Sequence, residues 1–188
     1  MPHSIDYAFI SSLEGGSRLT GYVPAANVSR SGVTIATGFD LGQRNEADLR
    51  RLGLAPELIV RLKPYLGLKS IEAKQYLAKH PLVINCGDAG TIHRAVKTEH
   101  VRQLELKYMG SHHNQNNVAF SRLPAEAQTV IASVSFQYGI NLDIRAPRFW
   151  RAVSSQNWEA AMEELRNFGD AYPTRRHREA ERLARIVR

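Results

Sequence analysis

The segment that decides the fold is SGVTIATGFDLG, residues 31–42, which follows Glu14-Gly15-Gly16 near the N-terminus. A small hairpin sheet is predicted over residues 21–40, from Tyr22 and Val23, a Pro-Ala-Ala-Asn turn, and the alternation of Val33 and Ile35 with threonines between glycines. No other part of the chain shows a convincing strand pattern. Helix caps, glycines and prolines divide the rest at helical intervals. The sequence therefore predicts an α+β fold that is mostly helical.

Helix signals begin before this segment. Ser4 is expected to cap a first helix, and Gly15-Gly16 is expected to end it just after Glu14. The helix after Pro124 combines apolar with small residues and is expected to form the core. Further helices are expected after Asn45, from Pro56, from Ser70, after Gly90 or Thr91 up to Gly110, around Arg148 to Val153, from Asn157, and from Pro173 or Thr174. The polar run HHNQNN, residues 112–117, is typical of a surface loop.

Glu14, Thr34 and Asp40 together suit glycoside hydrolysis. One carboxyl group must donate a proton, and Glu14 suits this role because the negative end of a helix disfavours a charged carboxylate. The other must stay ionised, and Asp40 lies in a glycine-rich turn that offers backbone amides. Thr34 is placed to orient water. Each residue also has a structural interpretation. Glu14 is then an exposed helix end, Thr34 an ordinary strand residue and Asp40 a turn former.

Several glycines surround this set of residues. Gly32, Gly38 and Gly42 are expected to let the backbone bend sharply and approach a bulky sugar closely.

The stretch from Glu14 through SGVTIATGFDLG resembles the catalytic signature of the phage-type lysozymes, and within them that of pesticin and related bacterial toxins. This resemblance implies that Glu14, Thr34 and Asp40 are catalytic. Simpler phage lysozymes carry the second carboxylate before the threonine, but residues 22–33 contain no Asp or Glu, so Asp40 takes the role. The resemblance continues in SVSFQYGI at 133–140, in NWEAAMEELRNF, and in YPTRRHREAERL at 172–183.

The resemblance implies a lysozyme-like α+β fold in which a small sheet-bearing lobe and a helical lobe enclose the active-site cleft. We expect one domain over residues 1–188, with the first lobe at about 14–70 and the second at about 1–13 and 71–188. The implied reaction is hydrolysis of the β-1,4 bond between N-acetylmuramic acid and N-acetylglucosamine, without a metal or other cofactor. The family's chemistry implies inversion, but the residues leave retention open, because the separation of the two carboxyl groups decides between them.

Two further positions follow from the resemblance. An arginine of the family's C-terminal element approaches the catalytic glutamate, and Arg175 or Arg176 matches it. Phe39 either lines a sugar subsite or packs, and packing is preferred. Most arginines of this element are otherwise expected to form a solvated basic helix face.

The net charge of +7 and the pI of about 9.8 favour anionic partners such as nucleic acid, membrane surfaces or acidic wall polymers, and charge alone does not choose among them. No long apolar stretch or secretion leader is present, which predicts synthesis in the cytoplasm, delivery by dedicated machinery and no membrane insertion. An antibacterial effector acting in the periplasm of a target cell is expected. It would act as a monomer and meet a cognate immunity protein that plugs the cleft.

Other groups have weaker patterns. The histidines at 93, 100, 112 and 113 lack metal-ligand spacing. Cys86 cannot form an internal disulfide, and it is expected to be a buried thiol rather than a nucleophile paired with His93. Trp150 and Trp158 are expected to pack the helical lobe.

The alternatives are a phage-type endolysin, a lytic transglycosylase, an inactive wall-binding module and a basic helical protein that binds nucleic acid. The last lacks a recognition-helix signature.

Overall fold

The structure is a computed structural model that describes residues 3–14, 16 and 18–187. The chain divides into two compact units, which we call the helical unit (Met1–Glu14 and His100–Arg188) and the sheet unit (Gly15–Glu99). The sheet unit extends further along the chain than the sheet-bearing lobe expected at residues 14–70. That residues 1–188 make one domain stays a prediction.

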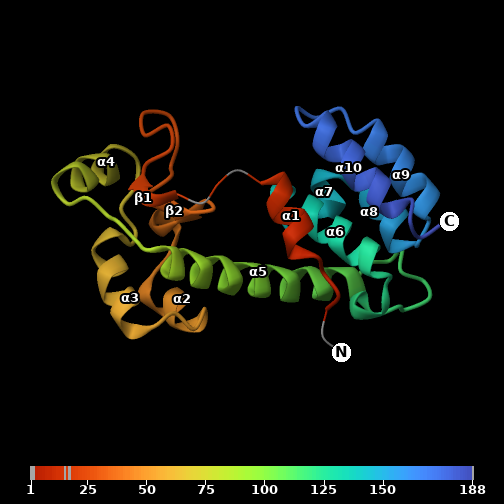
Figure 1. The fold of residues 1–188 in the computed structure, drawn as a ribbon, viewed down its shortest axis with the longest axis horizontal. Coiled ribbons are helices and arrows are strands. Elements are labelled where there is room, and N and C mark those ends of the chain that lie inside the picture. The colour runs from red at the N-terminus through yellow and green to blue at the C-terminus, as the bar shows by residue number, and fades with distance from the viewer. Residues whose placement is uncertain (1–2, 15, 17, 188) are drawn as a thin grey trace. The chain divides into compact units, whose positions relative to one another are not determined.

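Among the residues that the structure describes, the sheet unit contains three short antiparallel strands in the order β1-β2-β3. The strands are β1 (Arg18–Tyr22), β2 (Thr34–Ala36) and β3 (Phe39–Asp40), drawn in red to orange (Figure 1). The predicted hairpin sheet is therefore confirmed. The strands are followed by η1 (Leu41–Gln43), α2 (Glu46–Arg51), α3 (Pro56–Leu62), η2 (Lys63–Tyr65) and α4 (Ser70–Lys79).

The helix starts predicted at Asn45, Pro56 and Ser70 are confirmed. Asn45 and Asp48 form a reciprocal capping box, with each side chain accepting from the other residue's backbone amide at 3.0 Å. Ile35 of β2 is fully buried in the core of this unit, among residues of α2 and α3. The sheet is thus anchored by the helices that follow it.

The long helix α5 (Cys86–Met109) begins earlier than predicted. The prediction placed its start after Gly90 or Thr91, because glycine disfavours a helix interior. Asn85 and Asp88 instead bond each other's backbone amides at 2.8 and 3.3 Å, and this cap outweighs the cost of the glycines. The predicted end before Gly110 is confirmed. Since the two units divide at residues 99 and 100, α5 contributes to both.

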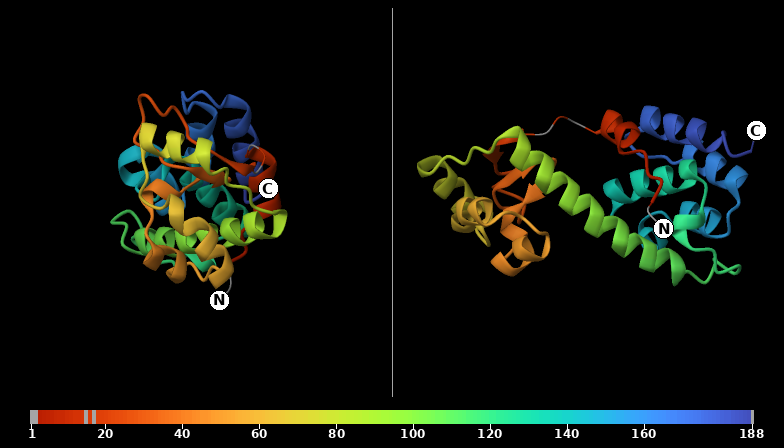
Figure 2. Two further views of the ribbon diagram at one scale, coloured as in Figure 1. Left: turned by 90° about the vertical axis from the view of Figure 1, so that its left-hand side faces the viewer. Right: turned by 60° about the horizontal axis from the view of Figure 1, so that its bottom comes forward.

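The helical unit is built around α6 (Ala125–Tyr138), in which residues 127–135 are all buried. This confirms the prediction of a core helix. α6 contacts α1, α7 and α10, and the right-hand view shows α1 in red and α10 in blue beside it (Figure 2). The other elements are α1 (Tyr7–Leu13), η3 (Phe120–Arg122), α7 (Leu142–Arg145), α8 (Pro147–Ser154), α9 (Trp158–Arg166) and α10 (Pro173–Leu183).

The cap of α1 differs from the prediction. Asp6, rather than Ser4, accepts a hydrogen bond from the amide of Phe9 at 2.9 Å. The backbone amide of Ser4 instead donates to Gln128 Oε1 at 2.9 Å. The chain before α1 is therefore tied to α6 rather than capped locally.

The tryptophans and the polar loop are placed as predicted. Trp150 is 4% exposed in the core of the helical unit, and Trp158 packs against this core. Residues 112–117 form a loop. In it the buried side-chain amide of Asn114 donates to the Val118 carbonyl and accepts from the Val118 backbone amide, both at 3.0 Å. Among residues 3–14, 16 and 18–187, no helix has the length and apolar character needed to cross a bilayer.

His100 lies in α5 on the side that faces α6. Its Nε2 lies 2.9 Å from Ser135 Oγ, and its ring lies 4.7 Å from that of Phe136. Ser135 already donates its hydroxyl proton to the Ala132 carbonyl, so Nε2–H of His100 is the donor to Ser135. Burial lowers the pKa of His100 to about 4, although its contact with Ser135 opposes this.

We therefore predict that the protein loses stability as the pH falls from 6.5 to 4. In this window the unfolded chain binds a proton at His100 that the folded protein excludes. The loss attributable to His100 is about 3 kcal/mol. Urea unfolding of the His100→Gln variant, which keeps an N–H donor, should show a flatter pH dependence. The matched control is His177→Gln, because His177 is 66% exposed. An unchanged slope in His100→Gln contradicts the prediction.

Candidate active site

Thr34 and Asp40 lie directly opposite each other in the sheet. They are partners in the antiparallel register of β2 and β3, and the neighbouring pair is Ile35 and Phe39. Directly opposed residues of two strands place their side chains on the same sheet face. The structure therefore brings together two of the three residues that the sequence predicts to be catalytic.

The carboxylate of Asp40 is held by backbone amides. Its Oδ1 accepts hydrogen bonds from the amides of Gly32 and Gly42, both at 2.9 Å. The other oxygen, Oδ2, accepts no hydrogen bond from a residue that the structure describes. Asp40 thus has one oxygen committed to the turn and one available for chemistry. The side chain is half-buried.

Gly32 and Gly42 pack closely against each other in this turn. A Cβ atom on Gly32 would lie 2.5 Å from the Cα of Gly42 and 2.3 Å from the carbonyl oxygen of Leu68. A Cβ on Gly42 would lie 2.5 Å from the same oxygen. Both glycines therefore allow the close approach of backbone to backbone that a sharp bend needs, and their approach to a sugar stays a prediction. Gly38 has a φ of +90°, which the turn between β2 and β3 requires.

Thr34 is 3% exposed. Its hydroxyl donates to the carbonyl of Gly32 at 3.2 Å, so its proton points into the turn and its lone pairs remain able to accept a hydrogen bond. Gly32 is therefore bonded to both Thr34 and Asp40, and it fixes the two side chains relative to each other.

Glu14 belongs to the other unit. It directly follows α1 as the C-cap, in an extended conformation, and its amide bonds the Ser11 carbonyl at 3.2 Å. Its predicted place at the end of the first helix is confirmed. Of the two glycines predicted to end this helix, Gly15 lies outside the described residues and Gly16 lies within them.

Arginines of α10 contact α1 and its N-cap residue. Arg182 binds the Asp6 carboxylate at 2.8 Å, Arg178 donates to the Ser12 hydroxyl at 3.0 Å, and Arg175 donates to the Leu13 carbonyl at 3.4 Å. The ring of Phe9 lies under Arg178 and Arg182, with centroid distances of 5.7 and 4.7 Å.

The prediction of a solvated arginine face is thus wrong for Arg175, Arg176 and Arg182. The side chain of Arg176 is 2% exposed and pairs with Asp170 and Glu179. Burial disfavours its cation, but the carboxylates of Glu179 and Asp170 outweigh burial and raise the pKa of Arg176. Of the two arginines proposed to approach Glu14, Arg175 is the one that reaches the end of α1.

Phe39 is 5% exposed in the core of the sheet unit, where Arg44 lies 5.4 Å from its ring centroid. This is the packing role that the sequence favoured.

Cys86 is exposed at the start of α5, so the prediction of a buried thiol is wrong. The early start of α5 explains this, because its first turn faces solvent. The side chain of His93 forms a hydrogen bond with Thr37, with 2.8 Å between Nδ1 and Oγ1.

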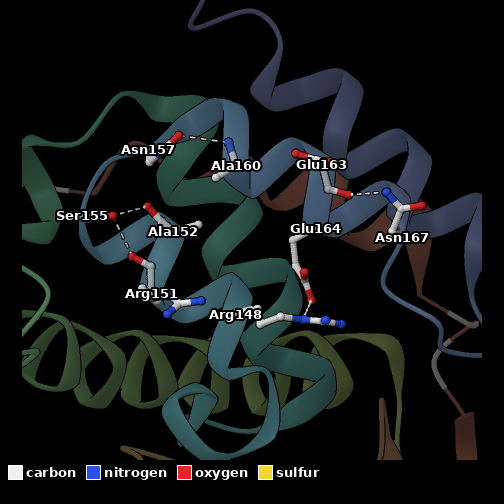
Figure 3. A pocket seen from close by; sticks show the side chains of 9 residues that line it. All are labelled: Arg148, Arg151, Ala152, Ser155, Asn157, Ala160, Glu163, Glu164 and Asn167. Carbon is white, nitrogen blue, oxygen red and sulfur yellow. Dashed lines mark hydrogen bonds and ion pairs between the residues drawn. The ribbon is translucent and has the colours of Figure 1, made fainter.

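No group of three or more His, Cys, Asp or Glu side chains suited to a metal occurs among the residues that the structure describes. A pocket of about 590 Å³ lies between α8 and α9, and Figure 3 shows Arg148 paired with Glu164 in it at 3.1 Å. None of the predicted site residues lines this pocket.

The family model described as "Pesticin: Bacterial toxin homologue of phage lysozyme, C-term" matches residues 4–159. The match includes Glu14, Thr34 and Asp40, whereas the segment at 172–183 lies beyond it. A search of curated proteins finds no match. The helical chain with its small antiparallel sheet confirms the expected α+β lysozyme-like fold. The chain therefore belongs to the pesticin family of bacterial toxins that are homologous to phage lysozyme.

Proposed function

We propose that this toxin is a muramidase, which hydrolyses the β-1,4 bond between N-acetylmuramic acid and N-acetylglucosamine. Membership of a family of lysozyme-like toxins makes peptidoglycan the substrate class. The observation that carries the finer proposal is the opposed pair of Thr34 and Asp40, in which Asp40 keeps Oδ2 available.

In the proposed reaction Glu14 gives its proton to the glycosidic oxygen as the bond to the sugar C1 breaks. Asp40 accepts a proton from a water through Oδ2, and the water oxygen bonds to C1 from the opposite face. Thr34 accepts a hydrogen bond from this water and orients it. One water is consumed, Glu14 loses one proton to the leaving oxygen, and Asp40 gains one proton from the water. Proton exchange with solvent restores both carboxyl groups, and the product has an inverted anomeric carbon. No cofactor enters these steps.

Charge supports the choice of substrate. The net charge of +7 attracts anionic wall polymers and increases the rate of encounter with them. Arg175 is proposed to support Glu14 electrostatically. Arg176 is buried in its own ion pairs, and Phe39 is buried in the core. We therefore assign both of these residues to the support of the fold rather than to sugar binding.

We predict that the wild type releases reducing disaccharide products from purified peptidoglycan, as measured by mass analysis of the soluble muropeptides. Glu14→Gln and Asp40→Asn should each lower the rate about 10²- to 10⁴-fold, the usual contribution of an acid or base. Asp40→Asn should remain folded, because its amide oxygen can still accept from Gly32 and Gly42. Glu57→Gln, at an exposed position in α3, is the matched control and should retain activity.

Other outcomes assign the other functions. Products with anhydro ends identify a lytic transglycosylase. Binding to peptidoglycan without any release identifies a wall-binding module and removes the enzyme proposal. Salt-sensitive binding to DNA, with no effect on peptidoglycan, supports the nucleic-acid alternative.

Biologically, we propose an exported antibacterial effector that acts in the periplasm of a target cell, rather than an endolysin released by a holin. The toxin family supports this choice. A producing cell then needs a cognate immunity protein. The basic pI of about 9.8 predicts that this partner is acidic and that salt slows its association. Titration with the product of the neighbouring gene should abolish muropeptide release, and a product that neither binds nor inhibits contradicts the effector role.

A further inference from the structure

A buried ionic network connects α6 and α10 in the helical unit. Its centre is Glu179, which is 0% exposed. Glu179 accepts hydrogen bonds from the Ser133 hydroxyl at 2.5 Å, from Arg175 Nε at 3.1 Å and from Arg176. Asp170 binds Arg176 from the other side at 2.9 Å. Two carboxylates thus neutralise two guanidinium groups, as buried charges require.

Arg175 uses this network on one side and α1 on the other. Besides Glu179, it donates to the carbonyl and the hydroxyl of Ser133 at 2.9 and 3.0 Å. Its remaining amino group donates to the carbonyl of Leu13 at 3.4 Å. The planar guanidinium group makes these bonds in one fixed geometry, so its orientation is set by α6 and α10.

The contact to Leu13 matters because α1 is short. α1 has only seven residues, and its last carbonyls lack partners within the helix. A cation that bonds one of these carbonyls stabilises the end of the helix. Glu14 is the next residue, and its backbone direction depends on how this turn ends.

Arg178 and Arg182 play a different part. They contact Ser12, Phe9 and Asp6 and so hold the body of α1. Among the residues that the structure describes, Arg175 alone bonds both Glu179 and Leu13, the residue that precedes Glu14.

We propose that Glu179 is a positioning residue, whose buried carboxylate, with Ser133, orients Arg175 so that it fixes the end of α1 and the backbone of Glu14. This proposal rests on the catalytic role proposed for Glu14. The sequence of α10 indicates that Glu179 shares a helix face with Arg175 and Arg176, but it does not indicate the contact of Arg175 with Leu13.

The test compares Glu179→Gln with Asp170→Asn. Both variants remove one carboxylate from Arg176, but only the first removes a partner of Arg175. We expect Glu179→Gln to lower kcat for muropeptide release about 10- to 100-fold with KM changed less than about twofold, the effect of a misplaced catalytic group. Asp170→Asn should leave kcat within about twofold of the wild type, measured where both variants are folded by circular dichroism.

Amide hydrogen exchange provides a readout that does not depend on activity. The amides of residues 10–14 should exchange about tenfold faster in Glu179→Gln and at the wild-type rate in Asp170→Asn. If Glu179→Gln does not fold, Ser133→Ala, which keeps the ion pairs, should show a smaller change in the same direction.

Equal losses of kcat in Glu179→Gln and Asp170→Asn overturn the proposal, and so does unchanged exchange at residues 10–14 in the variants of Glu179 and Ser133. A wild type without muramidase activity overturns the proposed function instead. In that case the exchange measurement still decides whether Glu179 fixes the end of α1.

Discussion

The geometry of the sheet unit depends on two hydrogen bonds from the amides of Gly32 and Gly42 to one oxygen of Asp40. They form because the two glycines pack backbone against backbone beside the carbonyl of Leu68, where no side chain fits. The carbonyl of Gly32 accepts a hydrogen bond from the hydroxyl of Thr34. A tight turn thus orients a carboxylate and a hydroxyl without using the second carboxylate oxygen, which is the arrangement expected of a base that activates water.

In the helical unit, Glu14 is held at the end of a helix of only seven residues. Such a short helix needs tertiary contacts to keep its end fixed. Three arginines of α10 hold this helix along its length, and Arg175 is itself held by Glu179 and Ser133. Ion pairs at the surface contribute little to stability, whereas the buried pairs here fix orientations that packing alone would leave free. Positioning, rather than stability, is the use that we assign to this network.

Patterns that depend on neighbouring residues could be predicted from the sequence. The hairpin of residues 31–42, the capping residue Asn45 and the core helix after Pro124 are examples. Features that depend on distant partners could not. The burial of Arg176 requires carboxylates from α10 and the preceding loop, and the exposure of Cys86 follows from a cap whose strength exceeds the cost of the glycines in α5. The spacing of Arg175 and Arg176 ahead of Glu179 was the available signal for the network, because residues three and four apart share a helix face.

The central claim is that Asp40 acts as a base on water rather than as a nucleophile on the sugar. A base activates water on the face opposite the leaving group, so hydrolysis of a β bond gives the α anomer first, whereas a nucleophile gives the β anomer. The most direct measurement is proton NMR of the anomeric signal during the first minutes of peptidoglycan hydrolysis, before mutarotation. If Asp40 acts as a base, we expect the α anomer of the new reducing end to appear first. Initial appearance of the β anomer would contradict it.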